Sequence, residues 1–237
     1  MAVPYRYTNR QEAGQYLARE LESYHRMNPI VLGLPRGGVI VAAEVARALN
    51  APLDIWAVRK LGLPQQPELA FGAISSDDVM VFDESLIRSA RLSETTIEAV
   101  AKREFAELNR RINRYRTAQS FRSISNYDIG GSNIILVDDG LATGLTAEAA
   151  IRSLRMHNPN TIIMAVPVAA EDSANRIRPL LDGFVCPITT RNLVAIGAWY
   201  SDFPQTSDED VLAALSDASA TARAETSKAS RNQTREA

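Results

Sequence analysis

The run from Ile134 to Thr146 constrains the fold of this chain more than any other segment; it reads Ile-Ile-Leu-Val-Asp-Asp-Gly-Leu-Ala-Thr-Gly-Leu-Thr. Its four leading apolar residues predict a buried strand of a parallel sheet. Asp138 and Asp139 follow at the carboxyl end of that strand, which is the edge where open α/β sheets bind ligands. The run therefore predicts a strand, a short polar loop and a helix, with two acids at the ligand-binding edge.

The loop of this run is suited to phosphate, because backbone N–H groups and a helix N-terminus attract anions. Two carboxylates beside it suit a ligand with vicinal hydroxyls or a metal, and a phosphorylated ribose fits that description. Response-regulator receivers also carry Val-Asp-Asp after a strand, but near the N-terminus, whereas roughly 130 residues precede it here. A purely structural strand–turn–helix is the remaining alternative, although it needs only one aspartate as a helix cap.

This run resembles the 5-phosphoribosyl-1-pyrophosphate (PRPP) signature of the type I phosphoribosyltransferases. The resemblance implies that Asp138 and Asp139 hold the ribose hydroxyls and that the loop holds the 5′-phosphate. Two positions depart from the most frequent pattern. Ala142 stands where hypoxanthine-type relatives have an aspartate, whereas adenine-type relatives also have alanine. Leu145 replaces a residue that is often glycine or lysine. The implied PRPP-binding residues of this run are Asp138, Asp139, Gly140, Ala142, Thr143, Gly144, Leu145 and Thr146.

A second anion site is predicted at Leu32-Gly-Leu-Pro-Arg-Gly-Gly38, where a strand ends and a helix starts. Glycines let the backbone approach a ligand, and Arg36 can neutralise phosphate oxygens. The resemblance implies that Arg36, Gly37 and Gly38 form the pyrophosphate loop. We expect the Pro35–Arg36 peptide to be strained or cis. The alternative is a tight turn with a surface arginine.

A third constellation follows the next predicted strand, where Arg59 and Lys60 supply two cations that the resemblance assigns to PRPP binding. Pro64 and Pro67 predict a loop over 59–69. In the family this region is a mobile lid that closes over PRPP and excludes water. Glu68 is the candidate for proton transfer, and an exposed glutamate without a role is the alternative.

A fourth segment, Ala195 to Phe203, resembles a hood over the sheet. Trp199 and Tyr200 are the candidates for stacking on an acceptor base, with core packing as the alternative for Trp199. Asp202-Phe203 is similar to an aspartate–aromatic pair that serves pyrophosphate-bound magnesium in relatives, although its spacing from Gly197 is one residue longer.

Strands alternating with helices predict an α/β fold with a doubly wound, mostly parallel sheet. The pattern adds a possible hairpin of 71–75 with 79–82 and a long helical insertion from Ser93 to about Tyr115. The arginines of that helix alternate with glutamates, which predicts a solvated face; a phosphate-facing or oligomer surface is the alternative. One domain is expected over 1–215. Residues 216–237 carry almost no large apolar side chain and predict a frayed or disordered tail.

The composition limits the class of protein. With a net charge of −2, the chain has no excess of positive charge that would favour non-specific nucleic-acid binding. The single cysteine, Cys186, excludes an internal disulfide, fits a reducing compartment and is expected to be a buried thiol rather than a nucleophile. No apolar run approaches a membrane span, and the N-terminus lacks the apolar core of a signal peptide. We therefore expect a cytoplasmic protein with small-molecule substrates, and a homo-oligomer.

The chain as a whole also resembles a little-characterised group of stand-alone predicted phosphoribosyltransferases. The likeness is carried by the segments 11–14, 33–38, 67–73 and 197–203. It implies an enzyme that transfers the 5-phosphoribosyl group of PRPP to a nitrogen acceptor, most simply a nucleobase, with Mg²⁺ on the pyrophosphate. The implied catalytic residues are Asp138, Asp139, Lys60 and Glu68. A non-catalytic PRPP- or nucleotide-sensing regulator is the alternative, and a hydrolase using water as acceptor is a third hypothesis.

Overall fold

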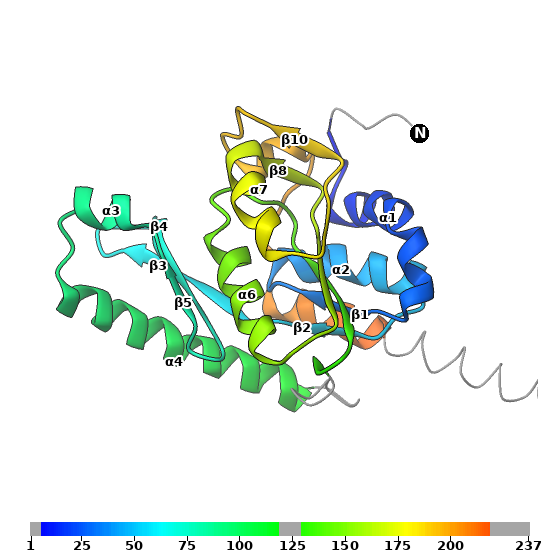
Figure 1. Ribbon diagram of the computed structural model, residues 1–237, viewed down its shortest axis with the longest axis horizontal. Helices are drawn as coiled ribbons and strands as arrows, with labels where there is room; N and C mark the ends of the chain where they lie inside the picture. Colours follow the sequence, from blue (N-terminus) through cyan, green and yellow to red (C-terminus); the bar gives the residue numbers. More distant parts are fainter. Residues whose placement is uncertain (1–5, 119–128, 219–237) are drawn as a thin grey trace, which may run out of the picture.

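The computed structural model describes residues 6–118 and 129–218. Its centre is a five-stranded sheet in which every neighbouring pair of strands is parallel (Figure 1). In spatial order the strands are β2 (Leu53–Ile55), β1 (Ile30–Gly33), β6 (Asn133–Val137), β7 (Thr161–Ala165) and β9 (Gly183–Val185). The predicted α/β fold with a mostly parallel sheet is confirmed.

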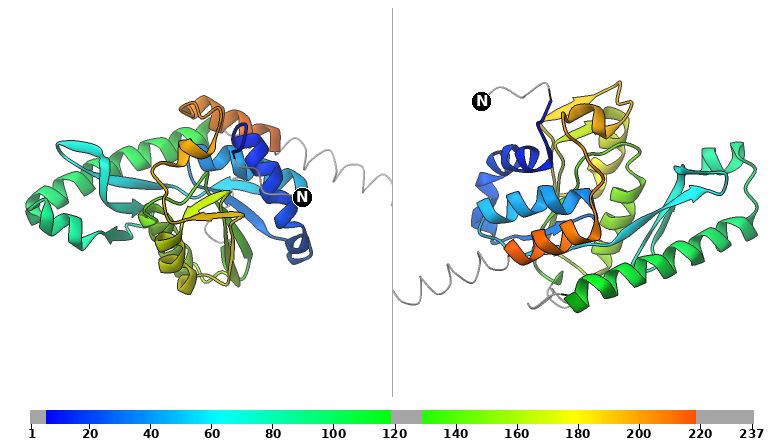
Figure 2. Two further views of the ribbon diagram at one scale, coloured as in Figure 1. Left: turned by 90° about the horizontal axis from the view of Figure 1, so that it is seen from above. Right: turned by 180° about the vertical axis from the view of Figure 1, so that it is seen from behind.

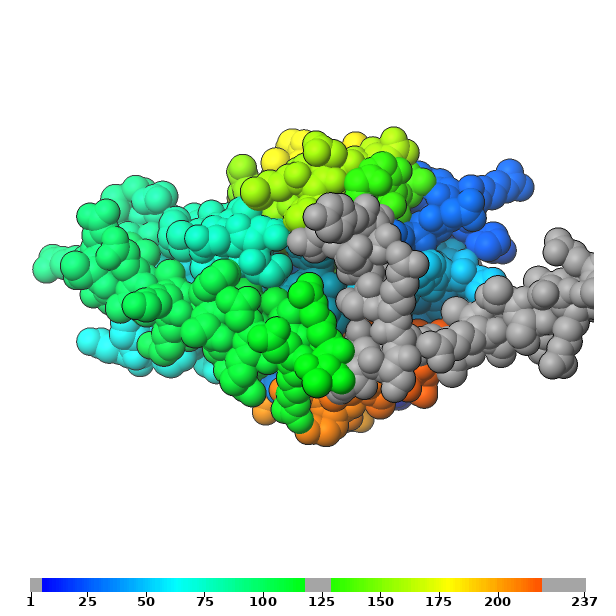
Figure 3. All heavy atoms as spheres, turned by 90° about the horizontal axis from the view of Figure 1, so that it is seen from below, coloured from blue at the N-terminus to red at the C-terminus, as the bar shows by residue number. Residues whose placement is uncertain are grey.

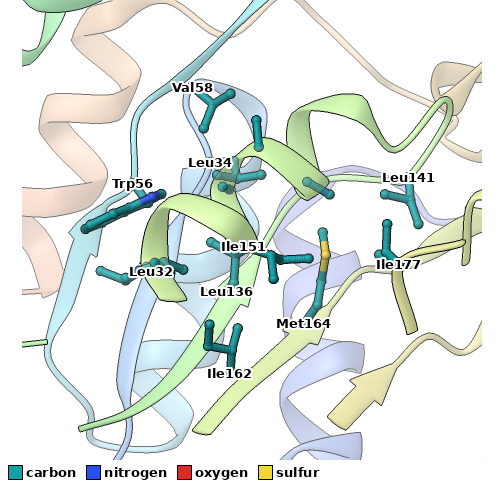
Figure 4. Packing of buried hydrophobic residues seen from close by; sticks show 14 of the residues in the cluster. Leu32, Leu34, Trp56, Val58, Leu136, Leu141, Ile151, Ile162, Met164 and Ile177 are labelled. Atoms are coloured by element: carbon teal, nitrogen blue, oxygen red, sulfur yellow. The ribbon is translucent and has the colours of Figure 1, made fainter. Parts of the chain in front are cut away.

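Strand β6 is apolar throughout its buried part because helices cover both faces of the sheet. Side chains alternate between the two faces. Ile134 and Leu136 pack with helix α6 (Leu145–Met156), and Ile135 and Val137 pack with helix α2 (Gly37–Ala48). Figure 4 shows Leu136 beside Ile151 of α6. The central strand that carries the acid pair is therefore held between two hydrophobic layers.

An arm extends sideways from the sheet (Figures 1 and 2). It contains an antiparallel sheet of order β3-β4-β5 and two helices. Its elements are β3 (Val58–Leu63), β4 (Gln66–Ser75), β5 (Met80–Phe82), α3 (Glu84–Ser89) and α4 (Glu94–Ala118). The predicted long helix is confirmed as α4, and the Oγ of Ser93 accepts the Thr96 N–H at its start. The predicted pairing of 71–75 with 79–82 is confirmed in the β4–β5 ladder, whereas the short helix α3 was not predicted.

The prediction of a loop over 59–69 is wrong, because this segment forms the β3–β4 hairpin. Its two prolines lie where they cost no ladder hydrogen bond. Pro64 is in the turn, and Pro67 lies in the irregular stretch between the Leu63–Gln66 and Gly62–Ala70 pairs, where the register shifts. A Cβ on Gly62 would be 2.2 Å from the carbonyl oxygen of Pro67, so only glycine fits this bulge.

A small hood covers the upper edge of the sheet in Figure 1. It contains the parallel pair β8 (Val168–Ala170) and β10 (Ile188–Thr190), the helix α7 (Glu171–Ile177) and the 3₁₀ turns η2 (Arg178–Leu180) and η3 (Ile196–Trp199). After β7 and again after β9 the chain leaves the main sheet and enters the hood, where it forms β8 and β10. The isolated bridge of Tyr7 with Tyr200 ties the N-terminal segment to the hood.

Both ends of the described chain pack against helix α2. The N-terminal segment forms α1 (Arg10–Glu20) followed by the 3₁₀ turn η1 (Glu22–Met27). The inner face of this segment buries Ala13, Tyr16, Leu17 and Leu21. The helix over 208–218 buries Val211 and Leu215 in the α2 layer. Residues 216–218, predicted as the start of the tail, continue this helix. Residues 219–237 lie outside the described residues, so the rest of the tail stays a prediction.

Helix α4 also reaches the C-terminal helix. Asp208 accepts a hydrogen bond from Tyr115 Oη at 2.7 Å and from Arg114 Nη1 at 3.0 Å. In Figure 3 the end of α4 (green) lies next to this helix (orange). Among the described residues, none of the helices is both long and apolar enough for a membrane crossing.

The turn between β4 and β5 connects the arm to α6 through Asp77. Its Oδ2 lies 3.0 Å from His157 Nε2 and accepts a hydrogen bond from Ser153 Oγ.

We expect Asp77→Asn to destabilise the fold by about 1–2 kcal/mol, because a part-buried charged acceptor is lost. The unfolding midpoint should fall by several degrees in calorimetry. Asp78→Asn is the matched control, since Asp78 has a φ of 60° that asparagine tolerates. Equal midpoints for the two variants would contradict this role of Asp77.

Candidate active site

The carboxyl ends of β1 and β6 open onto a cavity of about 510 Å³. Its walls come from the loop after β1, the loop after β6, the β3–β4 hairpin and helix α4. Twelve of the predicted site residues line it: Arg36, Gly37, Arg59, Lys60, Glu68, Asp138, Asp139, Gly140, Ala142, Thr143, Gly144 and Thr146. Four segments far apart in the sequence therefore contribute to one cavity, as expected for the edge of a parallel sheet.

The loop after β1 lies directly against the acid pair. A Cβ on Gly37 would be 2.0 Å from Asp139 Oδ2, and one on Gly38 would be 2.8 Å from Asp138 Oδ1. No side chain fits at either position, so both glycines are required for this contact. Gly38 itself is buried beneath the cavity. The Pro35–Arg36 peptide is cis, which confirms the prediction for this bond.

The loop after β6 presents backbone N–H groups at the start of α6. Gly144 has a φ of 74° and is the N-cap residue of this helix. Ser173 and Arg176 of α7 donate hydrogen bonds to the carbonyl oxygens of Ala142 and Thr143. Within the described chain, the N–H groups of Thr143 and Gly144 have no hydrogen-bond acceptor. The predicted Leu145 does not line the cavity but is buried in the core. This loop has the features of an anion site.

The two acids at the end of β6 have different surroundings. Asp138 Oδ1 accepts the N–H of Asp139 at 2.8 Å. Desolvation at the cavity floor, and then repulsion from Asp139, raise the pKa of Asp138 well above its usual range. Asp139 is instead paired with a cation, because Arg10 Nε lies 2.8 Å from its Oδ2. Its carbonyl oxygen accepts a hydrogen bond from Tyr200 Oη at 2.6 Å.

The two adjacent cations of β3 have different partners, because consecutive strand residues point to opposite faces. Arg59 is directed at α4, where its Nε donates to Glu104 Oε2 at 2.8 Å, and its Nη1 lies 3.8 Å from Glu107 Oε1. Lys60 lines the cavity and makes no ion pair with any described residue, and the same holds for Arg36. Arg59 was predicted to bind PRPP, yet its guanidinium already has two carboxylate partners.

Helix α4 contributes Arg103, Glu104 and Arg111 to the cavity, which the prediction of a solvated face did not include. The signal available in the sequence was the alternation of arginine with glutamate on this helix. That alternation alone does not separate a solvent-exposed face from one that faces a site. In the structure, the ion pair of Glu104 with Arg59 fixes α4 to the strand that carries Lys60, so this face of the helix borders the cavity.

The predicted hood residues lie behind the cavity rather than in it. Ile196 lines the cavity next to Gly140. Tyr200 is buried, and its ring packs at a tilt against Phe203 with the ring centroids 4.7 Å apart. Its hydroxyl donates to the carbonyl oxygen of Asp139. Trp199 packs in the hood cluster with them. Stacking of Trp199 or Tyr200 on an acceptor therefore has no geometric support here.

Asp202, the predicted metal ligand, lies in a separate cavity of about 530 Å³ on the other side of Arg10. Its backbone N–H donates to Thr8, which fixes this segment away from the acid pair. In the part of the chain that the structure describes, no three His, Cys, Asp or Glu side chains form a cluster that could hold a metal.

Comparison with known proteins shows which family this chain is similar to. The model of the phosphoribosyl transferase domain family matches residues 7–190. Two Mycobacterium tuberculosis proteins (strains CDC 1551 and H37Rv), each named "Putative phosphoribosyl transferase", are 42% identical over 209 residues. The match covers 88% of this chain and 46% of those proteins, so the chain spans about half their length. A crystal structure of a Thermus thermophilus protein matches with 37% identity and a TM-score of 0.71, over 90% of this chain and 98% of that one.

The different surroundings of the two acids predict opposite effects on stability. Because the folded pKa of Asp138 is raised, its stabilising contribution is complete below its unfolded pKa and is lost as the pH rises through the folded value. We expect Asp138→Asn to be more stable than the wild type at pH 8, by about 1 kcal/mol, with the difference disappearing near pH 4.

Asp139→Asn is the matched variant, and it should be less stable at pH 8 because it leaves the buried Arg10 without its partner. Thermal unfolding of the wild type and both variants between pH 4 and 8 measures the two effects. A stability loss of equal size in both variants at pH 8 would show that the acids are not distinguished in this way.

Proposed function

Because this chain belongs to the phosphoribosyl transferase family, we propose that it transfers the 5-phosphoribosyl group of PRPP to a nitrogen acceptor and releases pyrophosphate. One observation carries the proposal. The acid pair, a loop with free N–H groups at a helix start, and two cations without an ion-pair partner among the described residues line the same cavity. These are the groups needed for a ribose diol, a phosphate and an anionic leaving group.

The donor is bound along the edge of the sheet. The loop over 142–146 and the start of α6 hold the 5′-phosphate, with the hydroxyls of Thr143 and Thr146 as additional donors. The carboxylates of Asp138 and Asp139 accept hydrogen bonds from the ribose hydroxyls. Their negative charge also favours the positive charge that develops on the ribose ring as the bond from C1 to oxygen breaks.

The leaving pyrophosphate is held by Arg36 of the loop after β1 and by Lys60 of β3. Neither cation has a carboxylate partner among the described residues, so both are available to an anion. Arg59 acts indirectly in this scheme: it joins β3 to α4 and so holds the strand of Lys60. Bound Mg²⁺ supplies further neutralisation of the pyrophosphate oxygens.

The acceptor site is proposed at the hood side of the cavity, next to Ile196. Ala142 provides no base there. Glu68 is exposed on β4 and lines the cavity, so it is the proposed acceptor for the proton that leaves the nitrogen nucleophile. A nucleobase is the simplest acceptor of this kind. Burial raises the pKa of the partly buried Cys186 thiol to about 11, which disfavours the nucleophilic thiolate, so the proposal gives this residue no catalytic role.

Calorimetry with PRPP and Mg²⁺, combined with a pyrophosphate-release assay across a panel of nucleobases, tests the proposal. Asp138→Asn and Asp139→Asn should lower kcat about 100-fold or more, since they remove charge that stabilises the transition state. Replacing Thr143 and Thr146 by Val should instead weaken PRPP binding about tenfold and change kcat little, because only contacts to the 5′-phosphate are lost.

Glu12→Gln serves as a control, because Glu12 lies on the exposed side of α1 and lines neither cavity. Absence of magnesium-dependent PRPP binding by the wild type would end the transferase proposal. Intact binding without pyrophosphate release for any acceptor would favour the sensing regulator. Hydrogen exchange over 59–70, measured with and without PRPP, tests whether the β3–β4 hairpin orders on binding, which stays a prediction.

A further inference from the structure

Arg10 is the first residue of helix α1, and only 8% of its surface is exposed. It lies 129 residues from Asp139 in the sequence, yet its Nε donates to Asp139 Oδ2 at 2.8 Å. Burial of a charged side chain costs free energy unless the charge is paired, so a buried arginine with a specific partner is rarely without a role. Arg10 therefore needs a structural or a functional explanation.

The guanidinium of Arg10 is fixed by three different contacts. Besides Asp139, its Nη1 donates to the carbonyl oxygen of Pro204 at 2.8 Å. Its central carbon lies 3.7 Å from the centre of the Phe203 ring, in a cation–π contact. The contacts to Pro204 and Phe203 leave the guanidinium little freedom, so the carboxylate that it binds is held in one orientation.

Asp139 is held from its backbone as well. Tyr200 Oη donates to its carbonyl oxygen at 2.6 Å, and the Tyr200 ring packs on Phe203, the same ring that carries Arg10. The Oδ2 of Asp139 is occupied by Arg10, whereas Oδ1 has no hydrogen-bond partner among the described residues. Oδ2 of Asp139 thus holds the side chain to Arg10, and Oδ1 is available to a ligand in the cavity.

The pair also contacts the loop that is proposed to bind pyrophosphate. A Cβ on Gly37 would lie 2.7 Å from Arg10 Nε and 2.0 Å from Asp139 Oδ2. Any displacement of the Asp139 carboxylate toward this loop is therefore blocked by backbone. Arg10 and Gly37 together leave the carboxylate one position.

We propose that Arg10 is a positioning residue, which holds the carboxylate of Asp139 so that Oδ1 accepts a hydroxyl of the bound ribose. The inference rests on the proposed function, since it assigns Asp139 to the ribose diol. It places a requirement for ribose recognition on the N-terminal helix, outside both phosphate-binding loops.

A double-mutant cycle on PRPP affinity tests the proposal, using Arg10→Gln, Asp139→Asn and the double variant, each titrated with PRPP and Mg²⁺ in a calorimeter. Arg10→Gln should weaken PRPP binding about 10- to 100-fold, the value of a hydrogen bond to a charged group. If Arg10 acts through Asp139, the double variant should bind no more weakly than Asp139→Asn alone. Arg10→Lys should recover part of the loss, because it restores the charge but not the planar contacts.

Two further measurements separate positioning from general stability. Binding of pyrophosphate with Mg²⁺, which has no ribose, should be unchanged in Arg10→Gln. Arg178→Gln is the matched control, because this arginine also lies over an aromatic ring, that of Phe184 at 4.6 Å, but does not line the cavity. It should bind PRPP like the wild type.

The possible outcomes are distinct. If the two substitutions reduce the binding free energy of PRPP additively, Arg10 has a purely structural role. The same conclusion follows if Arg10→Gln weakens the binding of PRPP and of pyrophosphate equally. Wild-type PRPP affinity in Arg10→Gln would overturn the proposal outright. If Arg10→Gln does not fold, Arg10→Lys is compared with the wild type by the same criteria. Failure of the wild type itself to bind PRPP is a different result, which rejects the proposed function rather than the role of Arg10.

Discussion

The contact between the loop after β1 and the acid pair after β6 is the constraint on which the rest of the site depends. Two adjacent parallel strands end at the same edge, so the loops that follow them must share a small space. Gly37 and Gly38 make this possible, since a side chain at either position would overlap Asp138 or Asp139. The hydrophobic layers on both faces of β6 hold the strand that ends at these acids.

The charges around this contact are not balanced pair by pair. Arg10 neutralises Asp139, and Glu104 takes up Arg59. Asp138 has no such cation in hydrogen-bond contact, and burial raises its pKa. Within the described residues, Lys60 and Arg36 have no carboxylate partner. The desolvated carboxyl of Asp138 is a cost to the folded protein when it is ionised, and groups with such shifted pKa values are common where ligands bind.

The arm changes the role of two residues that the sequence presents as equivalent. Arg59 and Lys60 are neighbours in the chain and both line the cavity, but Arg59 is paired with Glu104 of helix α4, whereas Lys60 has no ion-pair partner among the described residues. Helix α4 is in turn held at its far end by Asp208 of the C-terminal helix. The strand that carries Lys60 is thus supported through α4 by a part of the chain about 150 residues away.

The sequence by itself determined the parallel sheet, the strand–loop–helix of the acid pair and the two glycines, because each depends on residues that are close together in the chain. It did not determine the β3–β4 hairpin, where a glycine bulge accommodates a proline that usually breaks strands. Nor did it indicate Arg10, or the burial of Tyr200 behind the cavity. These features depend on contacts between segments that are far apart in the sequence and meet only in the folded protein. Local sequence patterns do not indicate which distant segments will meet.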